Sequence, residues 1–189
     1  MPLKEFSRLR PVFVTLALYC FCHVALAEDI VSGEFELLDH EGQSVTEHSY
    51  DGKLRLLFFG FTQCPDVCPT TLFVVGRVMT LLGDDASQVQ PIFISVDRKN
   101  DTPERLASYV SAFHPSLVGL TGTEQQLDAA ARAFNVTYGI EKARPGDSGR
   151  DSIYHSAYLF LMDRQGRFID LFGYGSKAEV IAARLREYL

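Results

Sequence analysis

The sequence has little positive charge, few cysteines, and neither an internal repeat nor a low-complexity tract. Its 189 residues contain 18 lysines and arginines against 24 aspartates and glutamates, which gives a formal net charge of −6. Such a chain lacks the basic surface with which proteins bind nucleic acid or an anionic membrane, so the composition excludes nucleic acid as a partner. The length suits one domain, and no linker divides the chain after its first 27 residues.

Cysteine is too scarce for a disulfide framework. Four cysteines are present, and Cys20 and Cys22 fall within an apolar N-terminal run. The other two, Cys64 and Cys68, would close a loop too small to stabilise a fold of this size. We therefore expect this pair to serve chemistry rather than folding.

The N-terminus has the layout of a secretory signal peptide. Lys4, Arg8 and Arg10 precede sixteen uncharged, mostly apolar residues, Pro11 to Leu26, and small residues end the segment at Ala27. The run is short for a membrane-spanning helix, which needs about 20 residues. We expect residues 1–27 to be a cleaved signal peptide, with an uncleaved N-terminal anchor as the alternative. Residues 28–189 then form an exported domain with 15 bases and 23 acids, a net charge of −8.

Alternating strand and helix signals predict an α/β fold for residues 28–189, with a central mixed sheet flanked by helices. The apolar runs Leu54–Phe61 and Pro91–Val96 predict two strands that are buried on both faces. A short N-terminal hairpin is expected at Phe35–Leu38 with a turn at Glu41-Gly42. A second hairpin is expected to join Ser156–Met162 to Arg167–Phe172.

Four helices are expected between and after these strands. They begin near Pro69, at Thr102 (running to about Phe113), at a Thr123/Gln126 capping box and at a Ser176/Glu179 capping box. Parallel units followed by an antiparallel hairpin and a last helix are the arrangement of a thioredoxin-like domain.

The cysteine pair lies where the first buried strand gives way to a helix. Pro69 suits the first helical turn, which places Cys68 at or just before the helix start. Backbone N–H groups and the helix dipole favour an anion there, so we expect the Cys68 thiolate to be stabilised. A three-residue spacer allows Cys64 and Cys68 either to form a disulfide or to bind one soft metal ion. The spacing alone leaves redox and metal chemistry both open.

Among the histidines, His155 is the best candidate for a third ligand. It is expected at the mouth of the strand that begins at Ser156, on the sheet edge that faces the cysteine loop. From position alone, a satisfied structural histidine is the alternative. His40, His48 and His114 are expected to be solvated loop residues.

Five stretches give the chain a resemblance to the Sco/SenC family, the copper chaperones of cytochrome c oxidase assembly, over residues 30–189. They are Gly60–Pro69, Ile94–Asp97, Asp101–Glu104, Gly119–Gly122 and His155-Ser156. The resemblance implies that Cys64, Cys68 and His155 bind one copper ion, as Cu(I) or Cu(II), and that the cysteines also form a disulfide. It further implies a role for Asp97 beside the site or in partner contact, the alternative being a carboxylate that caps the following turn.

The resemblance also implies a function and a location. Family members deliver copper to the dinuclear copper centre of cytochrome c oxidase subunit II, or keep the cysteines of that subunit reduced. We expect the same or a similar copper acceptor here, in the periplasm or at the outer face of the inner membrane, with a possible tether through the N-terminal segment. Two positions depart from the family pattern: Tyr154 replaces the usual acid before the histidine, and Arg98 replaces the usual proline after Asp97.

Two enzyme classes are alternatives to a metallochaperone. A general thiol–disulfide oxidoreductase of the periplasm normally has a two-residue spacer facing a cis-proline, whereas here the spacer is three residues and His155 stands where that proline is expected. A thiol peroxidase shares the fold and uses a low-pKa cysteine, but would leave His155 without a role. Copper and a disulfide compete for the same sulfurs, so chaperone and reductase roles are compatible.

Overall fold

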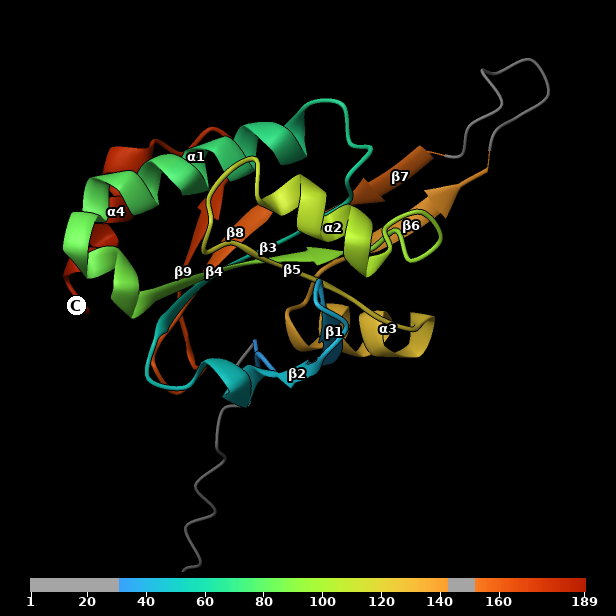
Figure 1. Cartoon of the computed structure of the whole chain (residues 1–189), viewed down its shortest axis with the longest axis horizontal. Coiled ribbons are helices and arrows are strands. Elements are labelled where there is room, and N and C mark those ends of the chain that lie inside the picture. Colours follow the sequence, from blue (N-terminus) through green and yellow to red (C-terminus); the bar gives the residue numbers. More distant parts are fainter. Residues whose placement is uncertain (1–30, 143–151) are drawn as a thin grey trace, which may run out of the picture.

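A computed structural model describes residues 31–142 and 152–189 of the chain, and the predicted leader lies outside these described residues (Figure 1). A seven-stranded mixed sheet has the strand order β2-β1-β5-β4-β3-β8-β9, and a two-stranded sheet is formed by β6 and β7. The strands are β1 (Glu36–Asp39), β2 (Ser44–Thr46), β3 (Leu54–Gly60), β4 (Val89–Ser95), β5 (Val118–Thr121), β6 (Tyr138–Glu141), β7 (Ser152–His155), β8 (Tyr158–Met162) and β9 (Phe168–Gly173). The helices are α1 (Val67–Leu82), α2 (Pro103–Val110), α3 (Glu124–Ala133) and α4 (Ala178–Arg186), with 3-10 turns at Glu47–Tyr50 and Gly83–Gln88.

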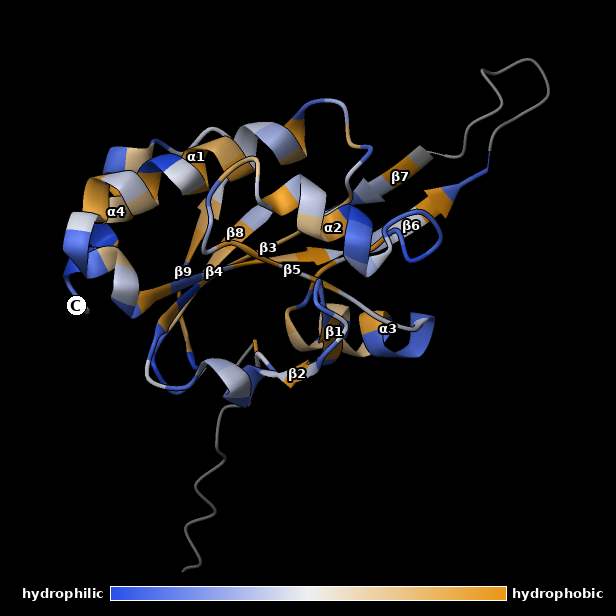
Figure 2. Ribbon diagram, in the orientation of Figure 1, coloured by the Kyte–Doolittle hydropathy of each residue, from blue (hydrophilic) through white to orange (hydrophobic). Residues whose placement is uncertain are grey.

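Strand β3 is the centre of the large sheet, and all seven of its residues are buried. It pairs in parallel with β4 and antiparallel with β8. Successive side chains point to opposite faces, so Leu56 and Phe58 join the core under α1 and α4, while Leu57 and Phe59 join the core beside α3. Figure 2 shows the hydrophobic residues gathered along these central strands and the polar residues on the surrounding loops. The predicted α/β fold with a buried mixed sheet is confirmed.

The helices form a layer on each face of the sheet (Figure 1). Helices α1, α2 and α4 contribute Leu72, Leu106 and Ile181 to one core, and α3 contributes Leu127 to the other. Helix α1 with its following turn is long and apolar enough to cross a membrane by length and composition alone. Its apolar residues nevertheless cover the sheet, which is the placement of a core helix in a globular domain.

Several expectations about element ends were right and others were wrong. The N-terminal hairpin is present as β1–β2, and Thr123 with Gln126 forms the predicted capping box of α3. The predicted capping box at Ser176 was wrong, because Lys177 is the N-cap of α4 and makes no side-chain capping bond. Helix α2 is shorter than expected, ending at Val110 before a hydrogen-bonded turn.

Three strands were not predicted. Strand β5 is a four-residue apolar segment whose pairing partners, β4 and β1, lie far away in the sequence. The other two, β6 and β7, pair with each other across residues 143–151, which lie outside the described residues. Strands this short carry too few residues for a period-2 pattern to stand out.

Replacing Gly76 of α1 tests how closely this helix packs. In a helix interior, alanine is more favourable than glycine by about 1 kcal/mol. A Cβ at Gly76, however, would lie 2.6 Å from the carbonyl oxygen of Phe113. We expect Gly76→Ala to lower the free energy of unfolding by about 1–3 kcal/mol in urea denaturation, because overpacking outweighs the gain in propensity. Gly173→Ala is the control, since its Cβ would meet nothing within 4 Å; a Gly76→Ala protein as stable as the control would contradict this packing.

Candidate metal centre

The first two site residues lie on the connection from β3 to α1. After Gly60 the chain turns, with the backbone N–H of Cys64 donating to the carbonyl of Phe61 at 3.2 Å. Helix α1 begins at Val67, so Cys68 is its second residue and lies slightly deeper in the helix than predicted. The backbone N–H of Cys68 donates to Sγ of Cys64 at 3.3 Å, which ties the two cysteines together.

Close packing around Cys68 requires a glycine at the end of β3. A Cβ at position 60 would lie 2.8 Å from Sγ of Cys68 and 2.8 Å from the ring of Phe93. Such distances are shorter than real Cβ contacts allow, so Gly60 lets the sulfur sit directly against the strand. Cys68 is fully buried as a result, whereas Cys64 is only half-buried.

His155 reaches the cysteines from the small sheet. It is the last residue of β7, paired with Tyr138 of β6, rather than the residue before a strand that starts at Ser156 as predicted. Its Nε2 lies 3.4 Å from Sγ of Cys68, and its Nδ1 lies 3.1 Å from the carbonyl oxygen of Ser156. A carbonyl only accepts, so we assign the proton to Nδ1; the lone pair of Nε2 then faces the sulfur. The ring packs edge-on against the aromatic rings of Phe58 and Phe61.

The three predicted ligands therefore converge. One ligand atom from each of Cys64, Cys68 and His155 lies within 4.8 Å of the other two, and both cysteines are free thiols. Two sulfurs and one imidazole nitrogen are donors that suit copper, the thiolates favouring Cu(I) and the imidazole extending the set to Cu(II). The donor set fits one copper ion.

Protonation in the metal-free site differs from the prediction for Cys68. Burial and the hydrogen bond with Cys64 raise the pKa of the Cys68 thiol far above its usual value, so helix-dipole stabilisation of a free thiolate was the wrong expectation. Burial lowers the pKa of His155, against a smaller opposite effect of its bond to Ser156, and keeps the imidazole neutral at neutral pH. Metal binding must then displace the Cys68 proton, so copper affinity rises with pH.

The acid predicted to support the site is engaged in a turn. The Asp97 carboxylate accepts hydrogen bonds from the backbone N–H of Asn100 at 3.2 Å and from its side-chain amide at 2.8 Å. These bonds cap the turn after β4; a role of Asp97 at the metal centre stays a prediction. The neighbouring Arg98 pairs with Glu124 at 2.9 Å, so its charge is balanced there.

The other histidines that the structure describes, His40, His48 and His114, lie apart from the three-ligand cluster. His48 is exposed beside Asp51, as expected of a loop residue. His40 is half-buried and its Nδ1 accepts the backbone N–H of Gly119 at 3.0 Å, which joins the entry hairpin to β5. His114 bonds Ser116 at 2.8 Å. The expectation of a solvated side chain was therefore wrong for His40, whose partner lies far along the sequence, and for the half-buried His114.

Asp101 is a buried acid near the site, and in the sequence it stands out only as part of a stretch that resembles the family. Its side chain has no exposed surface and accepts hydrogen bonds from Thr62 in the cysteine loop and from Ser95. The sequence signal for Asp101 was its place directly before the helix start at Thr102-Pro103. An acid at that position is ordinarily interpreted as part of the helix N-cap.

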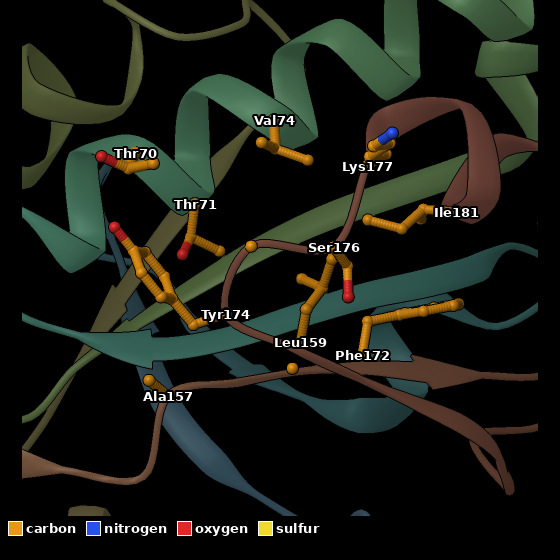
Figure 3. A pocket seen from close by; sticks show the side chains of 12 residues that line it. Thr70, Thr71, Val74, Ala157, Leu159, Phe172, Tyr174, Ser176, Lys177 and Ile181 are labelled. Carbon is orange, nitrogen blue, oxygen red and sulfur yellow. The ribbon is translucent and has the colours of Figure 1, made fainter.

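A pocket of about 300 Å³ opens beside the metal centre, between α1 and the connection from β9 to α4 (Figure 3). It is lined by Thr70, Thr71, Val74, Ala157, Leu159, Phe172, Gly173, Tyr174, Gly175, Ser176, Lys177 and Ile181. Two lining residues follow ligands closely in sequence, Thr70 after Cys68 and Ala157 after His155. The pocket contains none of the three ligands, and Lys177 is its single charged lining residue. It is thus a mostly apolar neighbour of the site and not part of the donor set.

The fold and the donor set define a thioredoxin-like protein with a Cys-Cys-His site suited to copper, and comparison with known proteins agrees. The SCO1/SenC family profile matches residues 24–189, so the chain belongs to the SCO1/SenC family. It is 36% identical over 169 residues to the human mitochondrial SCO1 homolog, covering 87% of this chain and 54% of that protein. It is 38% identical over 145 residues to the SCO2-like protein RP587 of Rickettsia prowazekii, covering 75% of this chain and 69% of that protein.

Solved structures give the same result. Copper-bound ScoI of Bradyrhizobium japonicum superposes with a TM-score of 0.76 at 41% identity, over 84% of this chain and 99% of that one. Copper-bound yeast Sco1 superposes with a TM-score of 0.72 at 34% identity, over 84% and 87% of the two chains. BsSco, a member of the Sco family of cytochrome c oxidase assembly proteins, is 20% identical with a TM-score of 0.66 and supports the fold alone. The chain spans 54–60% of the length of the first three curated relatives.

The position before the histidine generates one prediction. Neighbouring residues of a strand point to opposite faces, so Tyr154 points away from the side that His155 presents to the cysteines. The Tyr154 ring covers Gly139 across the small sheet, and 57% of the residue is exposed. An exposed charge on that face is screened by solvent. We therefore expect Tyr154→Asp to change Cu(II) affinity by no more than about threefold, as measured by competition titration.

The same titration at low and high ionic strength provides the control, because any residual effect of an exposed carboxylate shrinks with added salt. Tyr154→Asn is the matched uncharged variant. A gain in Cu(II) affinity above about tenfold for the aspartate alone would show that charge at this position acts on the metal.

Proposed function

We propose that this protein is an exported copper metallochaperone that delivers copper to the dinuclear copper site of cytochrome c oxidase or maintains the thiols of that site. The convergence of Cys64, Cys68 and His155 within 4.8 Å is the observation that carries the proposal. Membership of the SCO1/SenC family supports it, as do the copper-bound relatives of this fold.

The depth of the three ligands suggests how copper leaves the site. Cys68 is fully buried, whereas Cys64 lies half-exposed on the loop. An incoming thiol or imidazole of the acceptor therefore reaches copper from the Cys64 side. Exchange of one ligand at a time keeps the metal bound throughout, with the buried Cys68 as the ligand released last.

Thiol–disulfide exchange is the second candidate function, and the contact between the cysteines favours it. The Cys68 N–H already donates to Sγ of Cys64 at 3.3 Å, so the two sulfurs are close without rearrangement of the helix. Reduction of a client disulfide would transfer two electrons and two protons from the thiols and leave a Cys64–Cys68 disulfide. That disulfide removes both thiolate ligands, so the copper-bound and oxidised forms exclude each other.

The proposed setting follows from the N-terminal sequence. Residues 1–27 serve as a signal peptide or uncleaved anchor, and residues 28–189 act in the periplasm or at the outer face of the inner membrane. The copper acceptor in this proposal is cytochrome c oxidase subunit II or a protein with an equivalent copper site.

Copper stoichiometry tests the three-ligand site. The reduced protein is expected to bind one copper per chain, measured by metal analysis after removal of free ion. Cys64→Ala and Cys68→Ala should each weaken Cu(I) binding by more than about a hundredfold, because a lost ligand costs more than a lost outer contact. His155→Ala should weaken Cu(II) more than Cu(I), since two thiolates alone satisfy Cu(I).

The matched control is His114→Ala, which removes another partly buried histidine and leaves the three ligands intact. Its copper content should equal that of the wild type. Unchanged copper binding in either cysteine variant would exclude the three-ligand site.

The redox state provides a separate test. Oxidised glutathione should convert Cys64 and Cys68 to an intramolecular disulfide, releasing two reduced glutathiones per chain. The oxidised protein should lose labelling at both thiols and also lose tight copper binding, because no thiolate is left. Retention of tight binding after complete oxidation would mean that copper is held elsewhere; a Cys64→Ser variant, which forms no such bridge, controls for glutathione adducts.

A further inference from the structure

Asp101 lies at the junction of the cysteine loop, β4 and α2. It precedes Thr102, the N-cap of α2, and its side chain has no exposed surface. Its Oδ2 accepts hydrogen bonds from the backbone N–H of Thr62 at 2.8 Å and from the hydroxyl of Ser95 at 2.6 Å. Its Oδ1 accepts the hydroxyl of Thr62 at 2.5 Å. One carboxylate thus joins the loop before Cys64 to the last residue of β4.

The counter-charge of this carboxylate acts on the same loop. Arg105, one turn along α2, places its Nε 3.8 Å from Oδ1 of Asp101 and donates a hydrogen bond to the Thr62 hydroxyl at 2.9 Å. The Thr62 side chain therefore accepts from Arg105 and donates to Asp101. Asp101, just before the N-cap of α2, and Arg105, in its first turn, thus both hold Thr62, two positions before Cys64.

The three metal ligands differ in how the fold supports them. Cys68 is in α1 and His155 is in β7, so backbone hydrogen bonds of regular elements fix both. Cys64 lies on the connecting loop. Its backbone N–H donates to the carbonyl of Phe61, and its sulfur accepts a hydrogen bond from the backbone N–H of Cys68. A loop ligand needs an outer anchor to hold its place, and a buried carboxylate is costly unless its hydrogen bonds are made.

We propose that Asp101, acting through Thr62, is the positioning residue of the Cys64 loop. It holds Cys64 at the distance from Cys68 and His155 that a shared copper ion, or a disulfide with Cys68, requires. The part concerning copper rests on the proposed function. The part concerning the two thiols stands without it, because the same placement sets how readily Cys64 and Cys68 form a disulfide. Asp97, the acid singled out from the sequence, caps the turn that presents Asp101.

The test compares Asp101→Ala with Asp163→Asn. Asp163 also accepts several hydrogen bonds, from Gln165 and Arg167, but it follows β8 at the end of the sheet opposite the metal centre. Asp101→Ala should weaken Cu(I) binding by about 10–100-fold, the usual cost of losing an outer-shell partner. It should also shift the thiol–disulfide equilibrium constant in dithiothreitol buffers by about tenfold or more. Asp163→Asn should leave both quantities within about twofold of the wild type.

Thr62→Val and Thr62→Ser keep the proposal testable where Asp101→Ala does not fold. Valine removes the hydroxyl that bonds Asp101 at nearly constant volume, and serine restores it. Thr62→Val should shift both quantities in the direction of Asp101→Ala, and Thr62→Ser should return them to within about threefold of the wild type. Equal behaviour of the two variants would overturn the proposal, as would an Asp101→Ala protein with wild-type affinity and equilibrium constant but a lower melting temperature.

The two proposals fail differently. Wild-type protein that binds no copper would overturn the proposed function, and the dithiothreitol equilibrium would still report on positioning by Asp101. Wild-type protein that binds copper, with Asp101→Ala unchanged in both measurements, would overturn the positioning role alone.

Discussion

The burial of the Cys68 sulfur at the end of β3 is the constraint on which the site depends. It requires glycine at position 60, because any Cβ there would clash with the sulfur and with Phe93. It also brings the sulfur to within 3.4 Å of His155 Nε2, on a ring that Phe58 and Phe61 hold in place. The end of β3, the first turn of α1 and the small β6–β7 sheet are therefore packed together around the Cys68 sulfur.

That burial also sets the chemistry. Burial raises the pKa of the Cys68 thiol, and the burial of His155 lowers the pKa of its imidazole, so both side chains are neutral in the metal-free site. A soft metal ion, or oxidation to a disulfide, removes the Cys68 proton and replaces it with a covalent or coordinate bond. Cys64, a half-buried ligand on a loop, is the natural point of exchange, and that loop is held in place by hydrogen bonds to Asp101.

The central strands and the cysteine pair could be predicted from the sequence because both have local signals, whereas His155 entered the ligand set through the family resemblance. The apolar run at β3 and the Cys-x-x-x-Cys spacing are readable over a few residues, and Thr123 with Gln126 marks a helix start. Prediction failed where the decisive partner is distant in sequence: β5 with its two neighbours, His40 with Gly119, and Asp101 with Thr62. The prediction for the Cys68 thiol pKa was wrong for the same reason. The helix start that favours a thiolate is visible in the local sequence, whereas the burial that raises the pKa depends on distant residues.

X-ray absorption spectroscopy of the copper-loaded protein tests the central claim most directly. One copper ion held by Cys64, Cys68 and His155 predicts a first shell of two sulfurs and one imidazole nitrogen for Cu(II), with the imidazole contribution lost in His155→Ala and both sulfurs retained. A shell of nitrogen and oxygen alone, or a sulfur count that His155→Ala changes, would contradict the account.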